Sequence, residues 1–94
     1  MPRPRKTRRI GFSPETYYFK PRGVPLSLIE EVELFEDELE AIKLYGVDGL
    51  DQLESARKMN ISQPTFGRIW KSAYKKISGA IVYGRAIKIR QKTA

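Results

Sequence analysis

Residues 50–77 read LDQLESARKMNISQPTFGRIWKSAYKKI, a stretch that predicts two helices joined by a tight turn. Asp51 and Glu54 have the spacing of a capping pair, which places the start of the first helix at Gln52. Asn60 is suited to end that helix, because its short polar side chain tolerates the left-handed backbone conformation. The first helix is therefore expected to be short and capped at both ends.

The second helix is expected to begin after Ser62 and to carry an apolar face. Ser62 caps this helix, and Pro64 falls in its first turn, where no intrahelical donor is lost. Apolar side chains then recur at spacings of three and four, which predicts one buried face: Phe66, Ile69, Trp70, Ala73, Ile77, Ala80 and Ile81. We expect Trp70 at the centre of that face, largely buried against three side chains of the preceding helices, Leu39, Ile42 and Leu53.

The opposite face of the second helix carries Pro64, Arg68, Lys71 and Lys75. A short capped helix, a turn of about three residues and a longer helix with a basic outer stripe are typical of the helix-turn-helix motif. The second helix of that motif enters the major groove of DNA. Two amphipathic helices around a turn also occur in domains that bind nothing, so the charge distribution has to decide between the two interpretations.

Charge is distributed unevenly along the chain, whose net charge is +7. Residues 1–14 carry five basic and no acidic side chains, residues 15–54 carry three basic and eleven acidic, and residues 55–94 carry ten basic and none acidic. Surfaces that only keep a protein in solution normally mix both signs. A segment of charge +10 repels itself unless a polyanion neutralises it, so the second half of the chain predicts a nucleic-acid binder.

The chain has no cysteine and no histidine, which excludes disulfides, Cys/His zinc sites, thiol nucleophiles and histidine acid–base catalysis. The acidic run within residues 27–45 lacks a convergent base or metal ligand, so we interpret it as a solvated helix face that turns away from DNA. We therefore expect no enzyme, no metal, no cofactor and no small-molecule substrate. Because the chain has no long apolar run and no signal-peptide core, we also expect no membrane association and a cytoplasmic protein.

The N-terminal residues differ in composition from the rest of the chain. Residues 1–10, MPRPRKTRRI, hold five cations and two prolines, which predicts a flexible basic arm that lies along phosphates or enters the minor groove. Residues 11–94 are expected to form a single domain, with the helix-turn-helix at about residues 50–79. Within that domain Tyr17–Lys20 has strand-like composition, and we expect its aromatic side chains to cover the helical core.

The remaining elements predict a mainly α fold. Residues 31–34 alternate glutamate with apolar side chains as a short extended lead-in, and a helix is expected from near Glu36 to the loop at residues 46–49. After a helix stop at Gly84, residues 86–90 (AIKIR) alternate apolar with basic side chains, a period of two that predicts a strand. The predicted fold class is a three-helix bundle with a helix-turn-helix, a basic N-terminal arm and short extended or β segments at both ends.

A strand at residues 86–90 needs a partner, since one strand is not stable in isolation. That partner is either the Tyr17–Lys20 segment of the same chain or the equivalent strand of a second chain. Without cover, the apolar side chains near the C-terminus would form a patch beside an unpaired strand edge: Ile81, Val82, Ile87 and Ile89. We therefore expect a homodimer built from the C-terminal segment, which would present two recognition helices to DNA.

Several motifs of the chain match known family patterns. Residues 38–66, ELEAIKLYGVDGLDQLESARKMNISQPTF, resemble the helix-turn-helix of sigma-factor region four. With PRPRKTRRI (residues 2–10), YYFKPRGVP (17–25) and AIVYGRAIKI (80–89), nearly the whole chain is similar to a small prokaryotic family. That family is known as domain of unknown function 134, or uncharacterised protein family 0251. The resemblance implies a DNA-binding protein with a helix-turn-helix.

The resemblance also implies which residues meet DNA. In region-four domains the residues just after the cap of the second helix contact bases, which carries that role onto Gln63, Pro64, Gly67 and Arg68. The Gln63 amide would pair with adenine and the Arg68 guanidinium with guanine. Phosphate contacts are expected from five further cations: Arg57, Lys58, Lys71, Lys75 and Lys76. The arm would add non-specific affinity through Arg3, Arg5, Lys6, Arg8 and Arg9.

The predicted function is therefore that of a sequence-specific, double-stranded DNA-binding protein that regulates transcription. The sequence also leaves two alternative functions open. One is an RNA-binding or ribosome-associated protein, in which the aromatic side chains of residues 17–19 stack on single strands. The other is an adaptor module of the transcription machinery, in which the acidic helix meets a basic partner.

Overall fold

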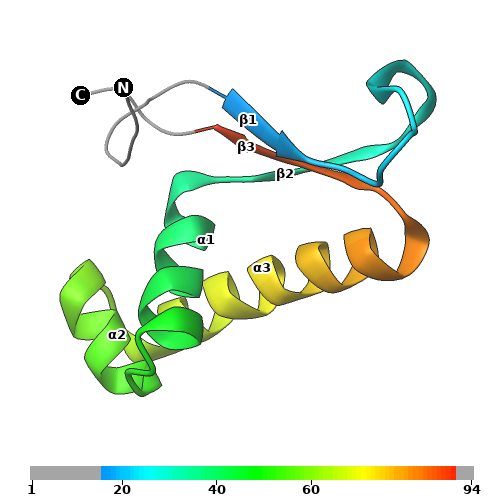
Figure 1. The fold of residues 1–94 in the computed structure, drawn as a ribbon. Coiled ribbons are helices and arrows are strands. Elements are labelled where there is room, and N and C mark those ends of the chain that lie inside the picture. The colour runs from blue at the N-terminus through cyan, green and yellow to red at the C-terminus, as the bar shows by residue number, and fades with distance from the viewer. Residues whose placement is uncertain (1–15, 91–94) are drawn as a thin grey trace.

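The computed structural model describes residues 16–90, in which helices cover one face of a small three-stranded sheet (Figure 1). The strands are β1 (Thr16–Phe19), β2 (Glu31–Leu34) and β3 (Ala86–Arg90). The helices are α1 (Glu36–Ala41), α2 (Gln52–Met59) and α3 (Gln63–Tyr83), with a 3₁₀ turn η1 (Leu26–Leu28) and a π-helical turn η2 (Ile42–Val47). The prediction of a mainly helical chain with short β segments is confirmed.

Local signals set the ends of α2 and α3 where the sequence predicts them. Asp51 Oδ1 accepts a hydrogen bond at 2.8 Å from the backbone N–H of the third residue of α2, and Asn60 ends this helix with a φ of 62°. Ser62 Oγ accepts from Thr65 N at 3.2 Å at the start of α3, and Gly84 ends α3 with a φ of 69°. Asp51 and Ser62 thereby satisfy backbone donors that have no intrahelical partner, whereas the N–H groups of Asn60 and Gly84 donate to carbonyl oxygens of the preceding turn.

Strand β3 lies in the middle of the sheet, whose order is β1-β3-β2. It pairs antiparallel with β1 and parallel with β2, so Lys88 lies between Tyr18 and Glu33. Of the two partners left open by the sequence, the segment of the same chain is the one that pairs with residues 86–90, and the extended lead-in at residues 31–34 is a third strand. Strands β1 and β2 cover both edges of β3 and Ile89 is buried, so no unpaired edge is left at residues 86–90.

Two apolar clusters form the core. Leu34, Ala73 and Ile89 pack between the sheet and α3. Ala41, Ala56 and Phe66 pack where α1, α2 and α3 meet. The alanines let the helices approach closely, and the Phe66 ring, which has no exposed surface, fills the space between them.

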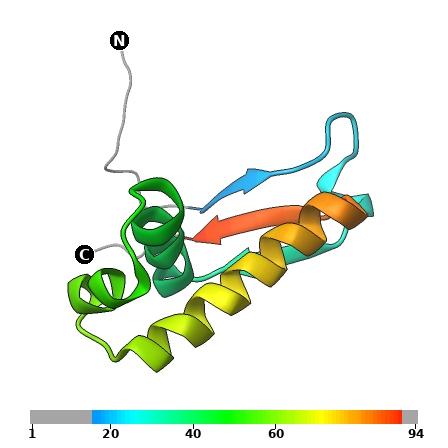
Figure 2. The same cartoon turned by 90° about the horizontal axis from the view of Figure 1, so that it is seen from below.

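Helix α3 is the longest element of the described chain and links the two clusters. It has 21 residues and runs past α1 and α2 (Figure 2). Its first half packs against both helices, whereas its second half lies mainly beside the sheet (Figure 1). Within residues 16–90, no helix combines the length and the apolar character that are needed to cross a bilayer.

The prediction that Trp70 is the centre of the α3 face needs correction, although its side chain does pack against the helical cluster. Trp70 is only partly buried, and its ring lies between the rings of Tyr45 and Tyr74, at centroid distances of 4.8 and 5.9 Å. Leu53, one of its expected neighbours, is 45% exposed. The centre is one turn earlier, at Phe66, because α1 and α2 cover mainly the first half of α3.

Two further predictions need correction. Residues 46–49 are not simply a loop, because the π-helical turn η2 continues α1 to Val47, with Asp48 N donating to Lys43 O at 2.8 Å. The aromatic side chains of β1 do not all cover the core either, since Tyr18 and Phe19 are both exposed.

Candidate nucleic-acid interface

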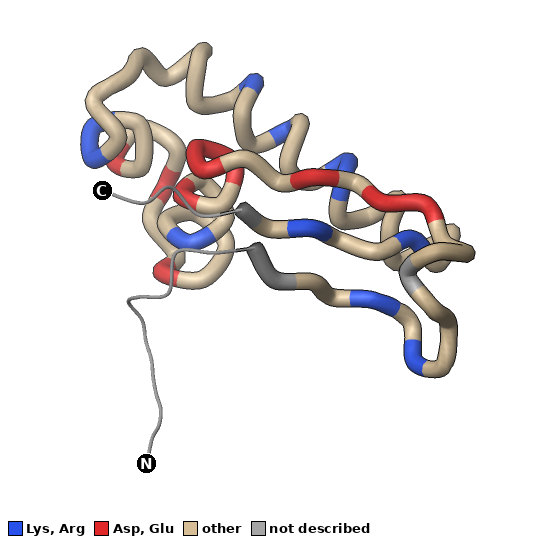
Figure 3. Tube along the Cα trace, turned by 90° about the horizontal axis from the view of Figure 1, so that it is seen from above, with Lys and Arg blue, Asp and Glu red and all other residues tan. Residues whose placement is uncertain are grey.

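The face of α3 that points away from the other helices and the sheet carries exposed cations. Arg68, Lys71 and Lys75 are exposed, and their spacing of three and four residues places them on one stripe. Arg68 Nη2 donates to Thr65 Oγ1 at 3.3 Å, which holds the guanidinium near the first turn of α3. Lys and Arg positions follow α3, whereas Asp and Glu positions gather on β2 and α1 (Figure 3). The stripe therefore has no carboxylate within it to neutralise it.

The structure brings together three of the four residues that are expected to contact bases. Gln63 and Pro64 are exposed in the first turn of α3, one turn before Arg68. Gly67 differs, because it is partly buried and faces α2: a Cβ added there would lie 3.7 Å from Gln52 Oε1, an ordinary contact distance. The N-terminal end of α3 thus offers an amide, a proline ring and a guanidinium to a ligand.

Two more cations flank this end of α3. Arg57 and Lys58 are exposed in the last turn of α2, directly before the turn that leads into α3. Cations are favoured at the C-terminal end of a helix, where the helix dipole is negative. Together with the α3 stripe they extend the positive surface over both helices and the turn between them.

Lys76, the remaining predicted phosphate contact, lies on another side of α3. Its Nζ is 2.8 Å from Glu38 Oε1 and donates to the Glu33 carbonyl O at 2.7 Å. The same ammonium lies 4.2 Å from the centroid of the Phe35 ring. These contacts engage Lys76 between α3 and the β2–α1 junction, so we leave it out of the candidate interface.

Glu38 is the buried polar group at this junction, with 4% of its surface exposed. Its carboxylate accepts hydrogen bonds from Lys76 Nζ, from Phe35 N at 2.9 Å and from Ser72 Oγ at 2.5 Å. Burial opposes ionisation, but the hydrogen bonds from Lys76, Phe35 and Ser72 outweigh it and lower the pKa of Glu38 below its ordinary value. An ionised Glu38 therefore ties α3 to the start of α1.

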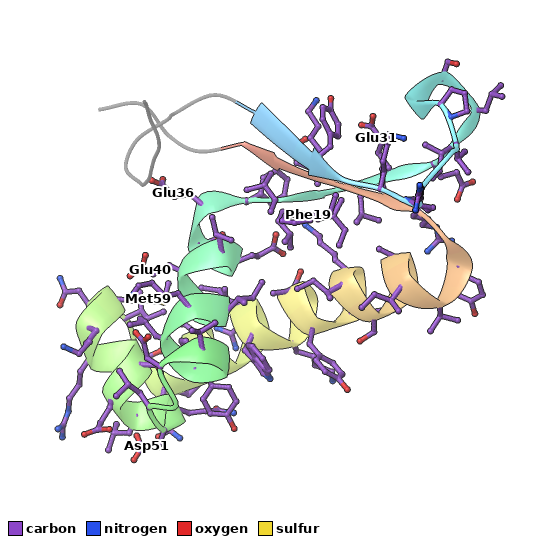
Figure 4. All side chains as sticks on the ribbon, in the orientation of Figure 1. Phe19, Glu31, Glu36, Glu40, Asp51 and Met59 are labelled. Carbon is purple, nitrogen blue, oxygen red and sulfur yellow. The ribbon has the colours of Figure 1, made fainter. Side chains whose placement is uncertain are left out.

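The buried position of Glu38 was not predicted, because the whole acidic run was interpreted as a solvated helix face. The spacing of Glu38 from apolar neighbours could have indicated that it is buried. Glu38 lies four residues after Leu34 and three before Ala41, and both of these side chains are buried. Glu36 and Glu40, by contrast, are exposed and project from α1 away from α3 (Figure 4).

Tyr18 and Phe19 of β1 do not form one stacking surface. The structure describes the side chains of Tyr18 and Phe19, which are successive residues of a strand and so project to opposite faces of the sheet. Phe19 lies on the side that faces α3, opposite to Glu31 of β2 (Figure 4). This arrangement gives no support to the single-strand-binding alternative.

The cations of the predicted arm, Arg3, Arg5, Lys6, Arg8 and Arg9, lie outside the described residues. The described part of the interface therefore consists of α2, the turn and α3. Its base-facing and phosphate-facing candidates are Gln63, Pro64, Arg68, Arg57, Lys58, Lys71 and Lys75.

Comparison with known proteins identifies relatives over most of the chain. A UPF0251 protein of Dehalococcoides mccartyi is 51% identical over 89 residues, which are 95% of this chain and 76% of the relative. UPF0251 proteins of Desulfosudis oleivorans and Caldanaerobacter subterraneus subsp. tengcongensis are each 52% identical over 95% of this chain, which covers 64% and 75% of those proteins. No solved structure matches.

A family model described as "Protein of unknown function DUF134" matches residues 1–92. This range includes the arm, the sheet and all three helices. The chain belongs to this family of proteins of unknown function, DUF134, together with the UPF0251 proteins of these bacteria.

Proposed function

We propose that the protein is a sequence-specific, double-stranded DNA-binding protein that regulates transcription. In this proposal α2, the turn at residues 60–62 and α3 act as a helix-turn-helix, and the N-terminal end of α3 enters the major groove. The observation that carries the proposal is the stripe of Arg68, Lys71 and Lys75 on the outer face of α3. No carboxylate occurs anywhere in residues 55–94 to weaken its attraction for phosphate.

Base recognition is assigned to the exposed residues at the start of α3. The Arg68 guanidinium can donate two hydrogen bonds to O6 and N7 of guanine, and the Gln63 amide can pair with N6 and N7 of adenine. Pro64 would contact a thymine methyl group. Gly67 faces α2 and is therefore assigned to the approach between the two helices instead of to a base.

Phosphate contacts are assigned to Lys71 and Lys75 along α3 and to Arg57 and Lys58 at the end of α2. Lys71 and Lys75 lie one and two turns beyond Arg68, at positions where a helix leaves the groove and passes the DNA backbone. The acidic residues gather on β2 and α1, the elements that pack against the inner side of α3 (Figure 1). Repulsion between them and DNA favours docking through α3.

A comparison of nucleic-acid types tests this proposal. Fluorescence anisotropy at fixed salt should show tighter binding to duplex DNA than to single-stranded DNA or RNA of the same length. Selection from a random duplex library should then enrich one sequence class. Equal or tighter binding to single strands would overturn the proposal and favour an RNA-binding role. If no nucleic acid binds at low salt, the adaptor role is favoured instead.

Two alanine variants separate base contacts from phosphate contacts. We expect Arg68→Ala to reduce the preference for the selected sequence by about 1–3 kcal/mol, because it removes a bidentate base contact. We expect Lys75→Ala to weaken binding equally on all sequences and to reduce the slope of log affinity against log salt by about one. Both side chains are exposed, so neither change should alter folding. Competition assays that show the same loss of preference in both variants would contradict the assignment.

A further inference from the structure

We propose that two copies of the chain pair through the C-terminal half of α3, antiparallel to each other about a two-fold axis near Ser78. This inference rests on the proposed function, because it states how two copies of α3 are presented to one DNA duplex. It differs from pairing through the C-terminal strand, which the position of β3 inside the sheet excludes.

The surface that carries the proposal is an exposed apolar stripe on α3. Tyr74, Ile81 and Val82 are 61, 74 and 72% exposed, and their spacing of seven and eight residues places them on one side of the helix. Phe19 of β1, 58% exposed, lines an apolar hollow of about 370 Å³ together with Ile81. On the other side of Val82, a shallow groove of about 760 Å³ extends along α3 to Tyr74, and the side chains of Lys71 and Lys75 also line it.

The size of this stripe is what a two-fold contact needs. The three side chains of the stripe and Phe19 of β1 together leave on the order of 500 Å² of surface exposed, so their complete burial on two copies would remove about 1,000 Å² from water. That is the lower limit for a specific interface between proteins. An apolar stripe is also complementary to itself, as an interface about a two-fold axis requires.

The sequence of α3 fits an antiparallel arrangement about Ser78. Tyr74 and Val82 are each four residues from Ser78. Tyr74 of one copy would therefore contact Val82 of the other, and Val82 would contact Tyr74. Ser78 is small, and it would let the two helices approach closely at the axis. The contact would occupy only the second half of α3, which α1 and α2 leave uncovered (Figure 2).

This arrangement leaves Arg68 free. At about 100° per residue, Arg68 lies roughly 80° around α3 from Ser78, whereas Lys75 and Lys71 lie about 60° and about 20° from it, at the edge of the contact. In a side-by-side antiparallel pair, the two Arg68 side chains would then point in the same direction. With a rise of about 1.5 Å per residue, the base-facing segments centred near Phe66 would be about 36 Å apart. One helical turn of DNA separates half-sites by about 34–36 Å, so both copies could read the same face of one duplex.

The mass of the full chain in solution without DNA tests this pairing. Sedimentation equilibrium at about 100 μM should give twice the chain mass of 10.8 kDa. The double substitution Ile81→Glu and Val82→Glu should give a mass near 10.8 kDa, because both side chains are exposed and the changes act on the contact and not on the core. Leu28→Glu is the matched control, an exposed apolar side chain on η1 whose replacement should leave the dimer intact.

A crosslink tests the register. The chain has no cysteine, so Ser78→Cys would place one thiol at the two-fold axis, and a mild oxidant such as diamide should convert it to a disulfide-linked dimer. Tyr83→Cys, an exposed position on a different side of α3, should form the crosslink much more slowly. A monomeric wild type, a dimer that survives the double substitution, or equal crosslinking at both positions would each overturn the proposal.

These measurements need no DNA and are therefore independent of the proposed function. A dimer that binds no DNA would overturn the function and leave the pairing intact. A monomer that binds duplex DNA with sequence preference would overturn the pairing and leave the proposed function intact.

Discussion

Phe66→Ala should lower the free energy of unfolding by about 3–5 kcal/mol, the largest single loss that we expect from any substitution in the chain. The Phe66 ring is fully buried between Ala41 and Ala56, and it meets the Tyr45 ring edge-on at a centroid distance of 6.0 Å. The two alanines are too small to fill the space that the ring would leave. Domains of this size are stable by about 5–15 kcal/mol in total, so the variant should be close to unfolding.

Urea denaturation followed by Trp70 fluorescence measures this loss, because Trp70 is the sole tryptophan of the chain. Leu53→Ala is the matched control. The Leu53 side chain is 45% exposed on α2, so its loss should cost less than about 1 kcal/mol. Comparable losses for the two variants would contradict the placement of the core at Phe66.

Glu38→Gln should destabilise the fold by about 2–4 kcal/mol at neutral pH, because it leaves Lys76 without its carboxylate partner at a mostly buried position. The pKa of Glu38 is lower in the folded chain than its ordinary value of 4.5. Its ionised form therefore adds stability that is fully present above about pH 4.5 and is lost as the pH falls through the folded-state pKa. The stabilities of wild type and variant should accordingly converge as the solution is acidified.

Chemical denaturation of both proteins between about pH 3 and pH 7 measures this convergence. Glu36→Gln is the control, since Glu36 lies in the same helical turn but is exposed, and its replacement should change stability by less than about 0.5 kcal/mol. A constant difference between wild type and Glu38→Gln over the whole pH range would show that ionisation of Glu38 does not stabilise the fold.

The helices that carry the candidate interface could be predicted almost to the residue. Their ends depend on contacts between residues three or four apart, such as Asp51 with the third residue of α2 and Ser62 with Thr65. Patterns of this length are visible in the sequence. The outward position of Arg68, Lys71 and Lys75 follows from the same period of 3.6 residues.

The features that the sequence did not predict depend on contacts between distant residues. The parallel pairing of β2 with β3 joins segments more than fifty residues apart, and neither strand carries a signal for its partner. The burial of Glu38 depends on Lys76, which lies 38 residues later. Trp70 was misplaced for a related reason, because the apolar period of α3 does not reveal which half of the helix the other helices cover.

The central position of β3 also determines the order in which this protein can fold during synthesis. Strands β1 and β2 are not hydrogen-bonded to each other, and both pair with residues 86–90. The helices α1, α2 and the first half of α3 pack on one another without the sheet, whereas residues 16–34 have no strand partner until residues 86–90 have been made. During synthesis the sheet, and with it the anchoring of β1, can therefore be completed only after the helices have been made.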